Sequence, residues 1–159
     1  PKMVTMDDGS QQLVDFGFVG DVDSANGRRL AALIKPQEGV EAVVPVVAPL
    51  THDGKGNILN TNADTMAATV AKALTEEFEV TLTYCFEKPG VMADADDDDS
   101  VIPTINTESY AQLKADGIVS GGMIPKLDNA FDSISSGVKR VVITHFMDIQ
   151  ASMGTVIEK

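Results

Sequence analysis

A polar cluster at residues 60–64 (NTNAD) separates a β-rich segment from a helical one. Before it, the valine-rich run Ala42–Pro49 and the pair Ile58-Leu59 favour strands, and residues 53–56 (DGKG) favour a turn between them. After it, apolar side chains recur at four-residue steps, which predicts a helix through Met66, Val70 and Leu74. In open α/β sheets, the point where a strand gives way to a helix is the edge at which ligands bind.

Two interpretations of this cluster remain open from the residues alone. Asn62 is suited to cap the helix, and Asp64 falls in the first turn, where a negative charge is favoured. Asn and Asp at a helix start are most often caps, so capping alone explains both residues. The alternative is a ligand site, because two amides and a carboxylate gather at one edge of the expected sheet.

The rest of the chain continues the alternation of strands and helices. Further strands are expected at Leu13–Val19, Glu79–Tyr84, Arg140–Thr144 and Thr155–Ile157. Helices are expected up to Ile34 with Asp23 or Ser24 as the cap, from Asn106 or Thr107 to Gly117, and from Met123 to Ser136. Residues 86–103 form a long irregular stretch with an acidic run. This order predicts one α/β domain over residues 1–159, a three-layer α/β/α sandwich with a mainly parallel sheet and helices on both faces.

Composition restricts the possible functions. The net charge of −12, without any cluster of Lys and Arg, argues against nucleic-acid binding and leaves any anionic ligand dependent on local cations. No apolar run has the length of a membrane span. The single cysteine, Cys85, excludes an intrachain disulfide and favours a reduced, cytoplasmic setting. The chain starts at Pro1, which indicates processing or a fragment.

A second candidate site is the segment Ser120–Lys126 (SGGMIPK). Its two glycines let the backbone approach a ligand, and the helix that follows offers free N–H groups to an anion. Pro125 fits the first helical turn, but the positive charge of Lys126 opposes the helix dipole there. A bound phosphate or a nearby carboxylate would remove this conflict. A glycine turn followed by a solvated lysine explains the segment equally well.

Several separated motifs together resemble the amino-acid kinase family, and within it the N-acetylglutamate kinases. The motifs are PVVAPLTHDGKGNILNTNAD, NTNADTMAATVAKAL, KPGVM, GIVSGGMIPKLDNAFDSISSGVKRVVI and GTVI, and they cover most of the chain in the expected order. The resemblance implies transfer of the γ-phosphoryl group of ATP, with Mg²⁺ carried by the nucleotide, to the γ-carboxylate of an N-acyl-glutamate in arginine biosynthesis. That carboxylate is already ionised, so the chemistry needs positioning and charge neutralisation rather than a general base.

The resemblance also implies roles for individual residues. Asp64 matches the family's organiser of the catalytic lysines, and Lys126 matches a lysine that neutralises the transferring phosphoryl group. Asn60 matches a residue that holds the amino-acid substrate, with a backbone N–H from Ala63 beside it. The nucleotide would contact a glycine loop together with a strand end and the loop after it: Gly121, Gly122 and Met123, with Thr83, Tyr84, Phe86, Lys88 and Val91.

Two departures from the family pattern limit these roles. The run LTYCFEKPGV is longer and less acidic than the commoner LTDVPGV, which weakens the assignment of the adenine and ribose contacts. The family's glycine-rich first loop, N-terminal lysine and substrate-clamping arginine have no counterpart here. The chain therefore resembles the nucleotide-binding C-terminal half, expected to be inactive alone, of an enzyme that is commonly a homo-oligomer.

The competing hypotheses are a different member of the family and a module without catalysis. Another amino-acid kinase would act on aspartate, glutamate, carbamate or a nucleoside monophosphate. A non-catalytic nucleotide-binding module would remain inactive when the other half is supplied. The remaining polar groups favour no further site: His52 and His145 are expected in loops or at strand ends, and the run Asp96–Asp99 is typical of a solvated loop.

Overall fold

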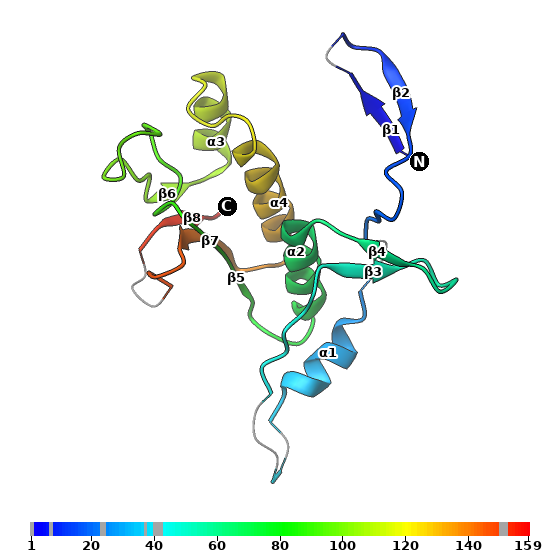
Figure 1. Ribbon diagram of the computed structural model, residues 1–159. Coiled ribbons are helices and arrows are strands. Elements are labelled where there is room, and N and C mark those ends of the chain that lie inside the picture. Colours follow the sequence, from blue (N-terminus) through cyan, green and yellow to red (C-terminus); the bar gives the residue numbers. More distant parts are fainter. Residues whose placement is uncertain (1, 7, 23–24, 37, 40–42, 150–152) are drawn as a thin grey trace.

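The computed structural model describes residues 2–6, 8–22, 25–36, 38–39, 43–149 and 153–159 (Figure 1). The strands are β1 Lys2–Thr5, β2 Gln11–Val14, β3 Leu50–His52, β4 Ile58–Asn60, β5 Thr81–Phe86, β6 Thr104–Ile105, β7 Arg140–His145 and β8 Thr155–Ile157. The helices are α1 Gly27–Ile34, α2 Ala63–Leu74, α3 Thr107–Ala115 and α4 Met123–Ser135. None of these helices is long and apolar enough to cross a membrane.

The main sheet has four strands in the order β5-β7-β8-β6. β5 pairs with β7 and β6 pairs with β8 in parallel, whereas β7 and β8 are antiparallel. The α/β class and the mostly parallel sheet are therefore confirmed. The antiparallel β8 makes the sheet mixed, which the strand signals in the sequence did not indicate.

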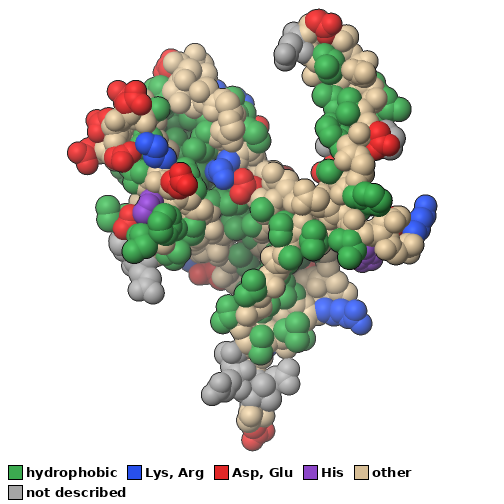
Figure 2. Space-filling view, in the orientation of Figure 1, with side chains coloured by type: hydrophobic (Ala, Val, Ile, Leu, Met, Phe, Trp, Pro, Cys, Tyr) green, Lys and Arg blue, Asp and Glu red, His purple; other side chains and the backbone are tan. Residues whose placement is uncertain are grey.

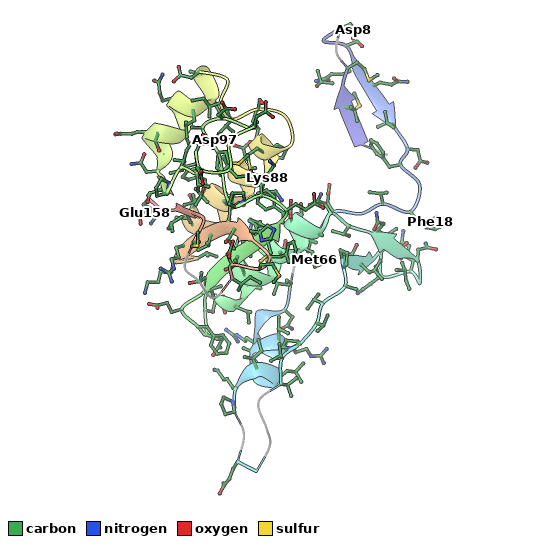
Figure 3. The ribbon with its side chains drawn as sticks, turned by 60° about the vertical axis from the view of Figure 1, so that its left-hand side comes forward. Asp8, Phe18, Met66, Lys88, Asp97 and Glu158 are labelled. Atoms are coloured by element: carbon green, nitrogen blue, oxygen red, sulfur yellow. The ribbon has the colours of Figure 1, made fainter. Side chains whose placement is uncertain are left out.

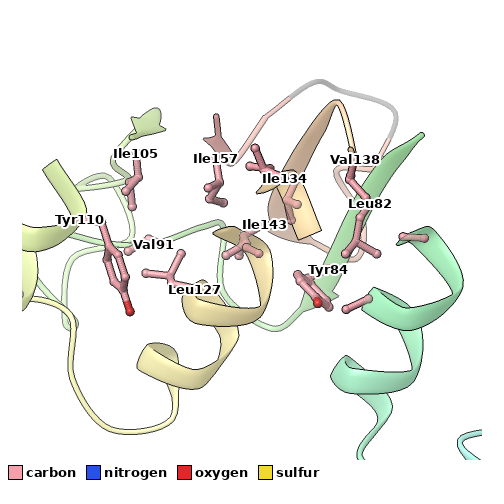
Figure 4. Packing of buried hydrophobic residues seen from close by; sticks show 14 of the residues in the cluster. Leu82, Tyr84, Val91, Ile105, Tyr110, Leu127, Ile134, Val138, Ile143 and Ile157 are labelled. Atoms are coloured by element: carbon pink, nitrogen blue, oxygen red, sulfur yellow. The ribbon is translucent and has the colours of Figure 1, made fainter. Parts of the chain in front are cut away.

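The hydrophobic core lies between this sheet and the helices α2 and α4 (Figure 4). Alternate residues of β5, Leu82 and Tyr84, are buried, and they pair in register with the buried Val141 and Ile143 of β7. Leu127 of α4 is fully buried against them. α2 contributes small residues, Ala68 and Ala71, which let it lie close to β5 and α4.

The opposite face of β5 is open within the described part of the chain. Thr81, Thr83 and Cys85 alternate with the buried residues and are exposed. The helices α2 and α4 share one face of the sheet, so neither of them supplies a layer over these three side chains.

The segment before β3 differs most from the sequence-based expectation. Residues 43–49 form no strand, and Val44 and Val46 are 86% and 97% exposed; Ala42 lies outside the described residues. The predicted strand was wrong because β propensity requires a neighbouring strand, and none of the described strands pairs with this run. Apolar side chains are also exposed on the hairpin of β1 and β2, which extends away from the rest of the chain (Figures 1 and 2).

Other differences concern the ends of elements. The strand expected at Leu13–Val19 ends at Val14, because Val14 pairs with Lys2, the first residue of β1; Gly17 beyond it takes a positive φ of 68°. The strand expected at Glu79–Tyr84 begins later, at Thr81, where pairing with Arg140 starts. The proposed caps Asp23 and Ser24 lie outside the described residues, and the side chain of Asn26 caps α1 instead.

The turn at residues 53–56 is confirmed and joins β3 to β4. The Asp53 carboxylate accepts hydrogen bonds from the backbone N–H groups of Lys55 and Asn57, and Gly54 and Gly56 take positive φ values of 72° and 100°. This hairpin leads the chain directly into α2, as the sequence indicated. The strand β3 itself was not predicted.

Candidate functional site

An ion pair joins the first turns of α2 and α4. The ammonium group of Lys126 donates a hydrogen bond to Oδ2 of Asp64 over 2.8 Å, although the two residues lie 62 positions apart along the chain. Their side chains are only 20% and 36% exposed, so the pair is partly shielded from water. α2 and α4 pack against each other, which brings the two predicted catalytic residues together.

The helix starts explain how this pair arises. The side chain of Asn62 accepts a hydrogen bond from the backbone N–H of Thr65 over 2.9 Å and so caps α2. Asp64 is therefore not needed as a cap, and its carboxylate is available to Lys126. The capping interpretation of the polar cluster is confirmed for Asn62, and the ligand-site interpretation stays a prediction.

Lys126 lies in the first turn of α4, where the helix dipole disfavours a cation. The conflict expected from the sequence is relieved by the carboxylate of Asp64. Two aromatic rings also face the ammonium group, with centroids 5.3 Å away in Tyr84 and 5.4 Å away in Phe86. These distances are within the range of cation–π attraction.

Tyr84 connects β5 to the start of α2. Its hydroxyl group donates a hydrogen bond to the backbone carbonyl oxygen of Asp64 over 3.2 Å. Burial of the phenol, together with the nearby charge of Asp64, raises the pKa of Tyr84 to about 12. The side chain therefore remains a neutral donor at physiological pH.

The glycine loop before α4 leaves space in front of the helix. Gly121 takes a positive φ of 53°, and Gly122 occupies the cap position without a capping side chain. A Cβ atom at either glycine would meet nothing within 4 Å. The two glycines therefore border open space at the start of α4, where the N–H groups of Met123 and Ile124 donate within the loop, to the carbonyl oxygens of Ser120 and Gly121.

Asn60 and Ala63 lie at the junction of β4 and α2. The backbone of Asn60 is held by the preceding segment, since its N–H donates to Phe18 and its carbonyl oxygen accepts from Gly20. Its side chain is exposed, as is Ala63, the first residue of α2. An N–H group in the first turn has no acceptor within the helix, so Ala63 could donate to a ligand.

A cavity of about 190 Å³ lies between the long loop after β5 and the start of α4. Four residues expected at the nucleotide line it: Phe86, Lys88, Val91 and Met123. Ser120, which begins the second candidate segment, also lines it, and four others were not assigned to a site from the sequence: Gly90, Met92, Ala95 and Ile118. Small and apolar residues such as these four carry no signal in a sequence that would assign them to a site.

Thr83 is placed differently from the other nucleotide candidates of β5, and Lys88 is held by the acidic loop. Thr83 projects from the open face of β5, whereas Tyr84 and Phe86 lie on the face toward the helices. The ammonium group of Lys88 reaches Oδ1 of Asp98 over 3.1 Å, which holds the acidic loop against the cavity. Figure 2 shows acidic side chains gathered over this loop, and Figure 3 shows Lys88 close to Asp97.

The described residues contain no group of three His, Cys, Asp or Glu side chains that could hold a metal ion. In the acidic loop, the carboxylate of Asp94 accepts a hydrogen bond from the backbone N–H of Asp96, and the carboxylate of Asp97 accepts one from the backbone N–H of Asp99. His52 and His145 end β3 and β7, as expected.

A larger open groove of about 890 Å³ lies elsewhere, between the start of α1 and the end of α2. Its polar side chains are already engaged: Lys72 pairs with Asp132, and Arg28 pairs with Glu76. It shares no lining residue with the smaller cavity. We place the candidate site at the smaller cavity because its lining includes Phe86, whose ring faces Lys126, and also Ser120 and Met123, which flank the glycine pair.

Comparison with known proteins decides the family. The model of the amino acid kinase family matches residues 3–145. The chain belongs to the amino acid kinase family. It is 58% identical over 146 residues to the acetylglutamate kinase of Phocaeicola vulgatus, covering 92% of this chain and 55% of that protein. The resemblance inferred from the motifs is thereby confirmed, and the chain spans about half the length of the curated relatives it matches.

Solved structures support the same fold. The protein smu.665 of Streptococcus mutans superposes with a TM-score of 0.69 at 27% identity, covering 92% of this chain and 54% of that one. A carbamate kinase from Giardia lamblia bound to AMP-PNP gives a TM-score of 0.50 at 20% identity, covering 65% and 36%. The likeness to the carbamate kinase shows the fold alone.

Proposed function

We propose that this chain is the nucleotide-binding portion of a kinase that phosphorylates the γ-carboxylate of an N-acyl-glutamate. The observation that carries this proposal is the Lys126–Asp64 ion pair, which lies beside an uncapped glycine loop. The identity to curated acetylglutamate kinases favours this branch over other amino-acid kinases. N-acetyl-glutamate is the proposed acceptor, in arginine biosynthesis.

In the proposed reaction, a γ-carboxylate oxygen of the substrate attacks the γ-phosphorus of ATP. A carboxylate O–P bond forms, the bond from the γ-phosphorus to the β–γ bridging oxygen breaks, and ADP leaves with the electron pair. No proton has to be removed, because the acceptor is already ionised. Lys126 would neutralise charge on the transferring oxygens, and Asp64 would hold Lys126 in position.

We place the base and ribose of the nucleotide at the 190 Å³ cavity, with Phe86, Val91 and Met123 as its apolar lining. The cavity is smaller than the usual range for a whole ligand, about 300–1,000 Å³, so the phosphates would extend from it toward the glycine loop. Gly121 and Gly122 border open space there. Mg²⁺ would neutralise the phosphates in a chain whose net charge is −12.

Asn60 and Ala63 are the proposed contacts to the amino-acid substrate. Both are exposed at the start of α2, next to Asp64 in sequence. The remaining contacts would come from the other half of a longer enzyme, since the chain spans only about half of its curated relatives. Homo-oligomerisation of that enzyme and a cytoplasmic setting remain predictions.

Reconstitution tests the proposal. The chain is mixed with the complementary portion of the acetylglutamate kinase of Phocaeicola vulgatus, and acyl phosphate is trapped as a hydroxamate. We expect product only when both portions, MgATP and N-acetyl-glutamate are present, and none with Lys126→Ala. Product with carbamate or aspartate in place of N-acetyl-glutamate would assign another member of the family. An inactive but stable complex would favour a non-catalytic nucleotide-binding module.

A further inference from the structure

The ammonium group of Lys126 is contacted by more than its carboxylate partner. Asp64 accepts its hydrogen bond at 2.8 Å, and the rings of Tyr84 and Phe86 face it with centroids 5.3 Å and 5.4 Å away. Two other lysines among the described residues, Lys35 and Lys114, each face a single ring. The position of this cation is thus defined by one charged and two uncharged groups.

The two rings are themselves fixed by the fold. Side chains alternate along β5, so Tyr84 and Phe86 lie on the same face as the helices. Tyr84 is 5% exposed, and its hydroxyl group donates to the backbone carbonyl oxygen of Asp64. Phe86 packs against the core and lines the 190 Å³ cavity. The rings therefore tie Lys126 both to the start of α2 and to the proposed nucleotide site.

We propose that Tyr84 and Phe86 are positioning residues that hold Lys126 for a phosphate group; this inference rests on the proposed function. An aromatic face attracts a cation through its quadrupole and adds no formal negative charge. A second carboxylate would fix the lysine equally well but would repel the anionic nucleotide. In LTYCFEKPGV, aromatic residues stand where the commoner family pattern is acidic. Lys126 is thus held without further negative charge in a chain whose net charge is already −12.

The first test needs no nucleotide. The chain is labelled with lysine carrying ¹³C at Cε, and the Lys126 signal is assigned by its absence in Lys126→Met. We expect its ε-methylene proton resonance upfield of the lysines that face no aromatic ring, because of the ring currents of Tyr84 and Phe86. Phe86→Leu and Tyr84→Leu should move it back toward them, whereas Tyr84→Phe, which keeps the ring, should leave it shifted.

A matched control uses an aromatic residue away from the site. Phe131 is also partly buried and stacks on Tyr110 at 5.1 Å, so Phe131→Leu should leave the Lys126 signal unchanged. Thermal unfolding of each variant establishes that it is folded. Phe86→Leu keeps the test decisive if Tyr84→Leu fails to fold, because Phe86 is only partly buried. A Lys126 resonance inside the lysine envelope, or one that Phe86→Leu leaves in place, overturns the inference.

The second test measures binding of the magnesium complex of AMP-PNP by calorimetry. Loss of one ring should weaken binding about 5–30-fold, the equivalent of a cation–π contact of one to two kcal/mol. In a Lys126→Met background Tyr84→Leu should have no effect, and Phe86→Leu, whose ring also lines the cavity, should cost less than it does in the unmodified chain. Equal losses in both backgrounds would refute a role through Lys126. If no variant binds while the resonance still follows the rings, the proposed nucleotide site fails and the positioning inference stands.

Discussion

The pairing of Asp64 with Lys126 gives a quantitative prediction about stability. Two opposite charges 2.8 Å apart attract strongly, but desolvation and side-chain ordering offset most of that energy. Fully exposed pairs contribute about 0.2–1 kcal/mol, and hydrogen bonds to charged groups about 1.5–3 kcal/mol. Because the side chains are 20% and 36% exposed, we expect a coupling free energy of about 1–1.5 kcal/mol.

A double-mutant cycle measures this coupling. Urea unfolding gives the free energy of unfolding for the unmodified chain, Asp64→Ala, Lys126→Ala and the double variant, and the coupling is the departure from additivity. The pair Lys139–Glu79 is the matched control, because it has a similar distance of 2.7 Å but side chains that are 57% and 72% exposed. Its coupling should stay below about 0.5 kcal/mol.

Salt separates the two pairs further. In 1 M salt the Debye length is about 3 Å, so the exposed control pair should lose its coupling while the shielded pair keeps most of it. Equal couplings for the two pairs, or a coupling near zero for Asp64 and Lys126, would refute the argument that Asp64, placed by the packing of α2 on α4, holds Lys126 in position.

Three further predictions concern single residues. Asn62→Ala should lower the free energy of unfolding by about 1 kcal/mol in urea, because it removes the cap of α2; an unchanged midpoint would contradict the capping role. Tyr84 has a folded-state pKa of about 12 against an ordinary 10.0, and burial together with the Asp128 hydrogen bond also raises the pKa of Tyr110. The folded state therefore retains phenol protons that the unfolded state loses, so the free energy of unfolding should fall as pH rises from about 10 to 12. Tyrosinate absorbance at pH 10 should accordingly appear only on unfolding. Gly154→Ala should lower the free energy of unfolding by more than about 2 kcal/mol, since its Cβ would lie 2.3 Å from the carbonyl oxygen of Ile143 at a φ of 114°. Gly121→Ala, with open space around it, should lower the free energy of unfolding by only about 1 kcal/mol. Equal losses for the two variants would contradict the steric argument.

Local signals made the two helix starts predictable. Each start depends only on residues that are close in sequence. Asn62 precedes an apolar four-residue repeat, and Gly122 precedes the run to Gly137. The conflict between Lys126 and the dipole of α4 indicated that a bound phosphate or a nearby carboxylate would relieve it, with a solvated lysine as the alternative. The identity of that group could not be deduced from the residues alone, because packing of α2 on α4 brings Asp64 there from 62 positions away.

The differences arose where structure depends on a neighbouring strand. The run 43–49 has strong β propensity, yet Val46 is 97% exposed because no described strand pairs with it. β6 was missed because two residues, Thr104 and Ile105, are too few to show alternation. The antiparallel direction of β8 follows from its pairing with β7, and a sequence pattern carries no information about strand direction.

The residues of the proposed nucleotide site also differ in where the structure places them. Phe86, Lys88, Val91 and Met123 meet at one cavity, whereas Thr83 projects from the other face of β5. A strand with alternating burial cannot direct both Thr83 and Tyr84 toward one ligand. Thr83 is therefore the least supported of the residues proposed to contact the nucleotide.

Calorimetric titration with the magnesium complex of AMP-PNP tests the central claim most directly. The chain is compared with Lys126→Ala and with the control Lys139→Ala, whose lysine pairs with Glu79 at an exposed position. The account predicts binding that Lys126→Ala weakens at least tenfold, about 1.4 kcal/mol, and that Lys139→Ala leaves unchanged. Binding that is equally strong in all three, or equally weakened by both substitutions, would contradict the placement of the phosphates beside Lys126.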